Sequence, residues 1–395
     1  MKAVEIKKDI YWVGAKDWNL REFHGYNTPD GSTYNAYLIM DKDITLVDGV
    51  KYYMTEEQLN RMKSVVDFAK IKYVVVNHVE QDHSGSIPQI MKLAPQAEVV
   101  TNMAGKQALE AHYDTTGWNF KIIKTGDVVN IGNRNITFLT TPMLHWPDSM
   151  MTYVVEDKIL LSNDGFGQHL CCEALFVKDY PNDLVFKNAK SYYANILMPF
   201  GKQAQKALNG ACELNLDIEM IAPSHGLIWS GKDEVNQILC AYKDWSEGKS
   251  ENKAVVVYDT MWGATAKLAE TAMAEFQDAG ISTIKYNLGI THISDVMTEV
   301  LDAKYVLVGT PTLNNQIFPR VAGFLTYMKG LQPQNKKGFA FGSYGWKPGV
   351  VMEVKKVMDD LGWAQTEAFE EKYTPKSDVL EKFALQIRDF IKSDN

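Results

Sequence analysis

The chain has 395 residues, 46% of them hydrophobic and 23% charged, with a formal net charge of -8. This length predicts two or more domains with cores of their own, and the composition excludes a disordered protein. The acidic balance argues against nucleic acid or an anionic membrane as the main partner, because both attract basic surfaces. No apolar run is long enough for a signal peptide or a transmembrane helix, so we expect a cytoplasmic protein.

The cysteines also argue against a secreted protein. The four thiols include no CxxC pair, and two of them are adjacent in sequence, which makes them poor disulfide partners. We expect Cys171, Cys172, Cys212 and Cys240 to be reduced and buried, and to form no rubredoxin-type iron site.

Short apolar runs bounded by turn residues dominate the first half and predict strands. Segments near 55–69 and 105–111 have helical character, so we expect layers of both element types. The predicted strands are Ile10–Val13, Tyr37–Met40, Ile44–Val47, Val74–Val76, Val99–Thr101, Ile136–Thr140, Thr152–Val155 and Ile159–Leu161.

The stretch VVVNHVEQDHSGSIP places four metal-ligand side chains directly after a predicted strand: His78, Glu80, Asp82 and His83. In an extended strand, alternate residues would lie about 7 Å apart in succession, too far to share one ion. The segment must therefore curl into a loop. The turn-forming residues that follow it are suited to such a loop.

Three further candidates follow, each near a strand-like or turn-rich segment: His145 in MLHWPDSM, Asp164 in ILLSNDGFG and His225 in MIAPSHG. The whole set of four imidazoles and three carboxylates is enough for two metal ions. Three buried carboxylates would be costly unless paired, and two divalent ions with a bridging hydroxide would neutralise them. Taken singly, each residue could instead be a helix cap or a hydrogen-bonded core histidine.

The loop suggests how the ligands divide between the two ions. We expect His78 and Glu80 to serve one ion and Asp82 and His83 its neighbour. Asp164, which has an oxygen for each ion, is the expected bridge. These nitrogen and oxygen donors alone would also admit zinc or manganese.

The first half resembles the metallo-β-lactamase fold, whose hydrolases carry HxHxDH at this loop. This chain has HxExDH, and the replacement by Glu80, with the spacing to His145, Asp164 and His225, resembles the flavodiiron proteins. The added carboxylate is a hard donor that favours higher oxidation states. The resemblance implies an αββα sandwich domain that holds two non-haem iron ions per chain.

Two weaker candidates lie outside this motif. His24 in REFHGY and Tyr193 in SYYAN could contact the ligands or line the substrate pocket. Ordinary packing is the alternative for both residues.

The polar segment 246–253 predicts a linker, and we expect domains over residues 1–249 and 250–395. Beyond the linker, strands and helices alternate strictly, which predicts a doubly wound parallel sheet. The expected strands are Ala254–Tyr258, Ser282–Tyr286, Tyr305–Gly309 and Gly338–Phe341, and the expected helices are Ala264–Ala279, Ser294–Asp302, Pro319–Lys329, Val350–Leu361 and Lys376–Lys392.

The first loop of this second half has the character of a phosphate cradle. It places hydroxyls and backbone N–H groups at the positive end of a helix dipole. It lacks the lysine of a P-loop and the glycine spacing of GxGxxG, so a monophosphate such as that of FMN suits it, with a plain helix cap as the alternative. The loop consists of Thr260, Met261, Trp262, Gly263, Ala264 and Thr265.

Two more loops follow predicted strands and should meet the first at the topological switch point of the sheet. Their amides and aromatic rings fit a flavin, although Trp262 and Trp346 could instead pack in the core. The pattern resembles flavodoxin, and flavodiiron proteins carry such a domain after the metal domain. The loop residues are Pro311, Thr312, Leu313, Asn314 and Asn315, then Ser343, Tyr344, Gly345 and Trp346.

The resemblance implies a flavodiiron oxidoreductase that reduces dioxygen to water, nitric oxide to nitrous oxide, or both, with electrons delivered through FMN. It also implies a head-to-tail homodimer or larger assembly. The electron donor would be external, either a rubredoxin-like protein or a reduced deazaflavin. The alternatives are a binuclear zinc hydrolase of the metallo-β-lactamase type with an appended flavodoxin domain, and a non-catalytic electron carrier.

Overall fold

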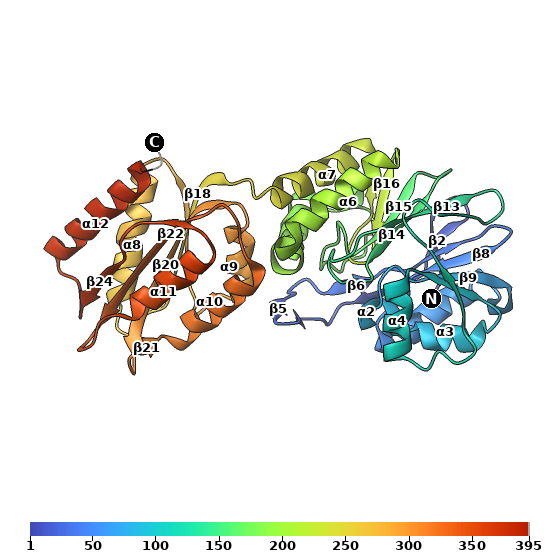
Figure 1. Cartoon of the computed structure of the whole chain (residues 1–395), viewed down its shortest axis with the longest axis horizontal. Coiled ribbons are helices and arrows are strands. Elements are labelled where there is room, and N and C mark those ends of the chain that lie inside the picture. The colour runs from blue at the N-terminus through green and yellow to red at the C-terminus, as the bar shows by residue number, and fades with distance from the viewer. Residues whose placement is uncertain (394–395) are drawn as a thin grey trace. The chain divides into compact units, whose positions relative to one another are not determined.

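The computed structural model describes residues 1–393. The chain divides into two compact units (Figure 1). The first unit comprises residues 1–193 and 200–246, and the second comprises residues 194–199 and the chain from residue 247 onward.

The first unit is built on two stacked sheets. The seven-stranded sheet has the order β1 (Val4–Lys7), β2 (Ile10–Trp12), β7 (Tyr37–Ile39), β8 (Ile44–Val47), β9 (Ile71–Val75), β10 (Glu98–Thr101) and β11 (Asn119–Ile122). The six-stranded sheet has the order β12 (Val128–Asn130), β13 (Asn135–Thr140), β14 (Met150–Val154), β15 (Ile159–Asn163), β16 (Met220–Pro223) and β17 (Trp229–Ser230).

Helices cover the outer face of each sheet (Figure 1). Short two-stranded pieces form where β3 (Ala15–Asp17) pairs with β6 (Ser32–Tyr34) and β4 (Glu22–Phe23) pairs with β5 (Tyr26–Asn27). The helices are α1 (Thr55–Lys63), α2 (Gln81–Ser84), α3 (Ile87–Leu93), α4 (Met103–His112), α5 (Asn182–Tyr192), α6 (Gly201–Glu213) and α7 (Lys232–Ser246).

Alternation along the strands explains the layering. In β9, Val74 packs in the cluster beneath α1, α3 and α4, while the next residue, Val75, packs in the cluster between the sheets. Successive side chains of a strand point to opposite faces, so an apolar run buried on both faces lies in a middle layer. The predicted αββα sandwich is confirmed.

The second unit is a parallel sheet with the order β19 (Ser282–Asn287), β18 (Glu251–Tyr258), β20 (Ala303–Leu313), β22 (Lys337–Tyr344) and β23 (Ala364–Gln365). Two further strands pair at its margin, β21 (Gln316–Ile317) with β20 and β24 (Phe369–Lys372) with β22. The helices are α8 (Ala264–Asp278), α9 (Ile293–Val300), α10 (Pro319–Leu331), α11 (Val350–Asp360) and α12 (Ser377–Lys392). The predicted doubly wound sheet is confirmed.

The predicted linker is too long at its carboxyl end, because residues 251–253 belong to β18. Lys253, which looked like a solvated linker residue, is only 6% exposed. Its Nζ lies 2.7 Å from Oδ1 of Asp302 and also pairs with Glu299. A buried lysine with two carboxylate partners is compatible with a strand.

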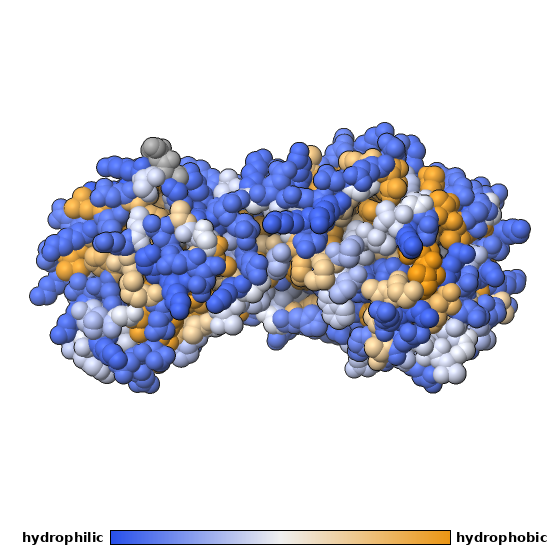
Figure 2. All heavy atoms as spheres, viewed as in Figure 1, coloured by the Kyte–Doolittle hydropathy of each residue, from blue (hydrophilic) through white to orange (hydrophobic). Residues whose placement is uncertain are grey.

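The expectation of four buried cysteines is wrong for two of them. All four are free thiols, but Cys212 and Cys240 are exposed, on helices α6 and α7. Figure 2 shows hydrophilic side chains over most of the visible surface, with small hydrophobic areas between them. Within residues 1–393, no helix has the length and apolarity needed to cross a membrane.

Candidate metal centre and cofactor pocket

The seven predicted ligands lie just beyond the ends of strands and come together in the first unit. His78 follows β9, Asp164 directly follows β15 and His225 follows β16. Asp82 and His83 are carried by the short helix α2, and His145 lies in the loop between β13 and β14.

The loop after β9 is held by a buried polar network. The backbone N–H of Asn77 donates to Oδ1 of Asp48 at 2.7 Å, and its side-chain amide donates to Oδ2 at 2.9 Å. Oδ1 of Asn77 accepts a 2.7 Å hydrogen bond from Thr152, on the other sheet. The loop that carries four ligands is therefore fixed from both sheets, as the site requires.

A close approach of two segments places α2. The backbone N–H of Gly49 donates to the carbonyl of His83 at 2.7 Å. A Cβ at residue 49 would lie 2.4 Å from Oγ of Ser86 and 2.8 Å from the carbonyl oxygen of His83. Only glycine allows this contact without a shift of the backbone that carries His83.

The ligand atoms form two groups. One atom from each of His78, Glu80, His145 and Asp164 lies within 4.8 Å of the others, and the same holds for Asp82, His83 and His225. The division of the four loop residues is the one expected from the sequence. Each group supplies nitrogen and oxygen donors in numbers suited to one ion.

Asp164 lies between the two groups. Its Oδ2 is 3.2 Å from Nε2 of His145, whereas its Oδ1 is 3.0 Å from Nε2 of His83 and 3.4 Å from Nε2 of His225. One carboxylate oxygen therefore faces each group. This is the arrangement expected of a carboxylate that bridges two ions.

Several of these buried atoms lack a hydrogen bond of proper geometry, although they lie close to charged partners. They are both carboxylate oxygens of Asp82, both ring nitrogens of His83 and Oδ2 of Asp164. Buried polar atoms are rarely left unpaired, and donor atoms aimed at a common ion would leave this pattern. The residues present therefore fit a pair of metal ions.

The electrostatics of the cluster also fit cations. Burial alone would lower the pKa of His145 and of His225, but hydrogen bonds to carboxylates outweigh it, and raise these pKa values to about 9 and about 10. Burial would raise the pKa of Asp164, but His83, His145 and His225 hold it well below its usual range. Without metal, the cluster is balanced by protons on imidazoles, which metal ions would replace.

His24 contacts the cluster. Its Nε2 lies 2.9 Å from Oε1 of Glu80, and its side chain is 70% exposed. The hydrogen bond with Glu80 raises the pKa of His24, and burial opposes this only in part. His24 therefore forms a polar contact with the predicted ligand Glu80, which ordinary packing would not require.

Tyr193 does not contact the predicted ligands by any hydrogen bond. Its buried hydroxyl has no hydrogen-bond partner, and its ring packs against Tyr242 and Trp245. The adjacent Tyr192 has the contact instead, donating from its hydroxyl to Oδ1 of Asp164 at 2.8 Å. Tyr192 ends α5, and the SYYAN motif alone did not show which tyrosine faces the cluster.

The sequence reading also missed Asp148 and His169. Oδ2 of Asp148 accepts from Nδ1 of His78 at 3.0 Å and from the backbone of Val79 at 2.7 Å. His169 is buried beside His225, with ring centroids 4.9 Å apart, and its Nδ1 lies 2.7 Å from Oγ of Ser32. Burial holds the pKa of His169 well below its usual range. The sequence signal that could have indicated His169 was its position in the glycine-rich loop that follows the predicted ligand Asp164.

The second unit contains a cavity of about 460 Å³ where the loops after β18, β20 and β22 meet. This volume is in the range of small-molecule and cofactor sites. Twelve of its lining residues were predicted from sequence: Thr260, Met261, Trp262, Ala264, Pro311, Thr312, Leu313, Asn314, Ser343, Tyr344, Gly345 and Trp346. Tyr373 and Thr374, from the segment after β24, also line it and were missed.

Three predicted cofactor residues do not line this cavity. Thr265 is fully buried, and its Oγ1 lies 2.9 Å from Oγ of Ser343. Gly263 has a φ of 83°, which favours glycine, and its N–H donates to Oγ1 of Thr260. Asn315 lines an adjoining hollow. Thr265 and Gly263 therefore determine the conformation of the loop but do not line the cavity.

The lining has features that fit a flavin phosphate and ring. The buried Oγ1 of Thr312 has no hydrogen-bond partner, so it is available to a bound molecule. Trp262 and Trp346 are 91% and 82% exposed, so the alternative that they pack in the core is wrong. Exposed aromatic faces beside a cavity are suited to stacking on a planar ring.

Two family models match the chain. Residues 33–226 match the ODP family beta lactamase, and residues 256–385 match flavodoxin. The fold and these matches define a class of protein in which a β-lactamase-like domain is followed by a flavodoxin domain.

Individual relatives cover nearly the whole chain. A nitric oxide reductase of Moorella thermoacetica is 46% identical over 350 residues, which are 88% of this chain and 87% of the relative. The structure of rubredoxin oxygen:oxidoreductase from Desulfovibrio gigas has a TM-score of 0.97 and 36% identity, covering 99% of this chain and 98% of that one. The flavodiiron protein from Giardia intestinalis has a TM-score of 0.96 and 34% identity, covering 99% and 96%. The chain belongs to the flavodiiron protein family, as the motif HxExDH indicated.

Proposed function

We propose that this protein is a flavodiiron oxidoreductase that reduces nitric oxide to nitrous oxide, dioxygen to water, or both. The observation that carries the proposal is Asp164, which offers one oxygen to each of two ligand groups. The names of the relatives, nitric oxide reductase and rubredoxin oxygen:oxidoreductase, support both substrates. A cavity of flavin size in the same chain supports an internal source of electrons.

We assign one iron to His78, Glu80, His145 and Asp164, and the other to Asp82, His83, His225 and the same Asp164. Bound iron would supply reversible one-electron chemistry and open positions for a diatomic gas, and FMN would accept electrons singly or in pairs. The carboxylate-rich set favours iron over zinc, because anionic oxygen donors stabilise a ferric ion.

The surrounding residues orient the ligands. Asp148 accepts from Nδ1 of His78, and the carbonyl of Thr33 accepts from Nδ1 of His225 at 2.7 Å. Each contact leaves Nε2 free to face the cluster, which fixes the ring for metal binding. Tyr192 donates to the shared carboxylate and limits its rotation.

Both reductions consume protons, and His24 is placed to deliver them. Its ring is largely exposed, and its Nε2 lies 2.9 Å from a carboxylate oxygen of Glu80. In the metal-free cluster, the hydrogen bond with Glu80 raises the pKa of His24 and so stabilises a proton on its ring. His24 can therefore take a proton from solvent and hold it at Nε2, beside the cluster.

We assign FMN to the cavity of the second unit. Residues 260–263 precede α8, and Ala264 and Thr265 begin its first turn, where backbone N–H groups favour a phosphate. Trp346 and Trp262 offer aromatic faces for the ring. We propose an external electron donor, a rubredoxin-like protein or a reduced deazaflavin, and the name of the structural relative rubredoxin oxygen:oxidoreductase supports the first.

We further propose a head-to-tail homodimer or larger assembly in the cytoplasm. Large aromatic side chains as exposed as Trp262 and Trp346 are characteristic of surfaces that meet a partner. Four free thiols are typical of a reducing compartment. Light scattering of the FMN-loaded protein tests the assembly, and a monomer with full activity would contradict it.

The hydrolase alternative is not favoured. The second metal-binding position of the hydrolase motif is histidine, and this chain has Glu80 there. A zinc hydrolase would also have no use for the flavin-sized cavity. The electron-carrier alternative leaves the paired ligand groups without a role.

The experiment that tests the function uses the iron- and FMN-loaded protein, reduced without oxygen. Dioxygen and nitric oxide are then added separately, while the flavin and iron spectra are followed and the products are measured. Reoxidation with formation of water or nitrous oxide is expected with at least one gas. Zinc content with thioester or phosphodiester hydrolysis, and no response to either gas, would overturn the proposal.

A further inference from the structure

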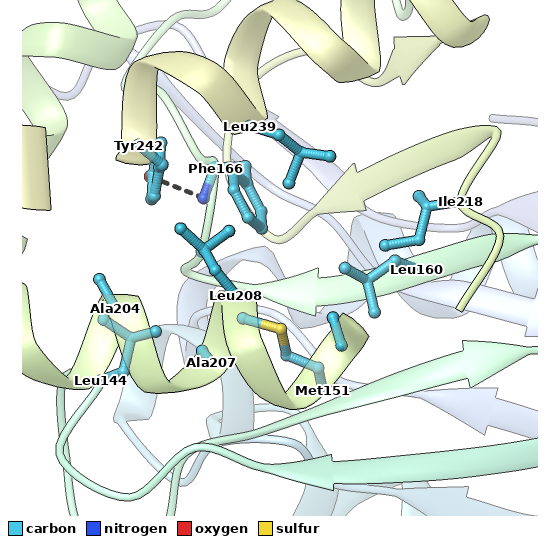
Figure 3. Close-up of a pocket in the computed structure, with 12 residues that line it drawn as sticks. Leu144, Met151, Leu160, Phe166, Ala204, Ala207, Leu208, Ile218, Leu239 and Tyr242 are labelled. Carbon is cyan, nitrogen blue, oxygen red and sulfur yellow. Dashed lines mark hydrogen bonds between the residues drawn. The ribbon is translucent and has the colours of Figure 1, made fainter. Parts of the chain in front are cut away.

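A small apolar cavity lies inside the first unit, beside α6 (Figure 3). Its volume is about 20 Å³, and the side chains around it end almost entirely in carbon or sulfur. The polar exception is Tyr242, whose hydroxyl already accepts a 2.7 Å hydrogen bond from the backbone N–H of Phe166 (Figure 3). Water needs several polar partners, so a cavity with this apolar lining binds water weakly.

The cavity adjoins both segments that present ligands to one metal group. Leu144 immediately precedes His145, and Gly165 immediately follows Asp164, and both line the cavity. Leu144 and Phe166 are buried, whereas Ala207 on α6 is only half-buried. The cavity therefore extends from the helix layer to Leu144 and Gly165, which are the chain neighbours of the predicted ligands His145 and Asp164.

The space suits one diatomic molecule. A cavity needs roughly 10–15 Å³ to hold a single water, and about 20 Å³ leaves room for a slightly longer molecule. Dioxygen and nitric oxide carry no charge and make weak hydrogen bonds, so they lose little hydration free energy when they leave water. An apolar cavity thus selects them over the solvent.

We propose that this cavity is a gas-binding site, which takes up dioxygen or nitric oxide next to the metal group that contains His145 and Asp164. The inference rests on the proposed function and deepens it, because it assigns residues to the delivery of substrate. Neither His145 nor Asp164 changes its role, and the cavity residues act by shape alone.

Three substitutions on α6 provide the test. Ala207→Leu places a larger side chain in the lining and fills the cavity. Leu208→Ala shortens a lining side chain and enlarges the cavity. Asn209→Leu is the matched control, because Asn209 is exposed on the same helix and does not line the cavity. Should Ala207→Leu fail to fold, Ala211→Val fills the same cavity from the next turn of the helix.

The first measurement is xenon binding, which does not depend on activity. Crystals of the metal- and FMN-loaded protein are pressurised with xenon, a dense probe for dry apolar sites. Xenon is expected between α6 and Leu144 in the wild-type protein, in Leu208→Ala and in Asn209→Leu, but not in Ala207→Leu. A wild-type cavity without xenon would overturn the inference.

The second measurement is the rate at which the reduced protein reacts with gas, as a function of gas concentration. Ala207→Leu is expected to lower the second-order rate constant by about tenfold, with iron and FMN content unchanged. Asn209→Leu should leave it as in the wild type, and an unchanged constant in Ala207→Leu would refute delivery through this cavity. A wild-type protein that reduces neither gas would overturn the proposed function instead, and xenon occupancy would still decide whether the cavity binds apolar gases.

Discussion

Nδ1 of His78 lies 3.0 Å from Oδ2 of Asp148, while Nε2 of the same ring lies 3.4 Å from Oε2 of Glu80. The first contact holds a proton on Nδ1, so Nε2 is the nitrogen that faces the cluster and would bind a metal ion. The backbone N–H of Val79 donates to the same oxygen of Asp148, so this carboxylate also holds the ligand loop. A residue that binds no metal thereby orients one that does.

Asp148→Asn is expected to weaken metal binding by about 10-fold to 100-fold, because the partner that orients His78 is weakened. Metal affinity is measured by competition with a chromophoric chelator. The exposed Asp183 provides the control, and Asp183→Asn should bind metal as the wild type does. Equal metal affinities in the two variants would show that Asp148 does not orient His78 for metal binding.

Neighbouring tyrosines give a matched pair of substitutions. Tyr192→Phe removes a hydrogen bond to the charged Asp164 and is expected to lower the free energy of unfolding of the metal-free protein by about 1.5–3 kcal/mol. Tyr193→Phe removes a hydroxyl without a hydrogen-bond partner, so stability should stay the same or rise. Urea denaturation measures both, and a larger loss in Tyr193→Phe would contradict the geometry.

The metal-free protein should lose stability as the pH rises. The pKa values of His145 and His225, about 9 and about 10, exceed the value of roughly 6.5 expected in an unfolded chain. A proton held more tightly in the folded state stabilises it fully below pH about 6.5, and this contribution is lost as the pH rises through the folded pKa values. Denaturation of chelator-treated protein between neutral pH and about pH 10 should show the decline, which iron-loaded protein should lack.

The same protons should appear when metal binds. His145 and His225 must lose a proton to become ligands, so ferrous ion added to the metal-free protein near neutral pH is expected to release protons. A pH indicator in weakly buffered solution measures the release. Uptake of metal with no change in pH would show that these imidazoles are neutral before binding.

Trp346→Ala is expected to weaken FMN binding by about threefold to tenfold, because one aromatic contact contributes about 0.5–1.5 kcal/mol. The side chain is 82% exposed, so the change should leave the stability of the FMN-free protein almost unaltered. Titration of FMN fluorescence gives the dissociation constant. Trp18→Ala, at a 46% exposed tryptophan of the first unit, is the control and should bind FMN normally.

Much of the fold could be predicted, because its long strands carry a clear apolar pattern. The strand β8 has the predicted bounds, and β13 and β20 contain the predicted runs. The short pairs β3 with β6 and β4 with β5 were not predicted, because two or three residues show no periodicity. Lys253 was misplaced in a linker because its carboxylate partners, Glu299 and Asp302, are remote in sequence.

The site divides in the same way. The four ligands of HxExDH share a motif, and Asp164 and His225 follow strand-like runs, so local sequence was informative. Asp148 and His169 lie in no such motif. They act through contacts with residues remote in sequence, Asp148 with His78 and His169 with His225. Tyr192 and Tyr193 differ only by one step of helix rotation, which sequence alone does not orient.

The central claim is that these seven side chains bind two iron ions, and anomalous diffraction at the iron absorption edge tests it most directly. Crystals of the protein as isolated should show two peaks, one beside His78, Glu80 and His145 and the other beside Asp82, His83 and His225, with Asp164 between them. A single peak, or peaks that appear only at the zinc edge, would contradict the account.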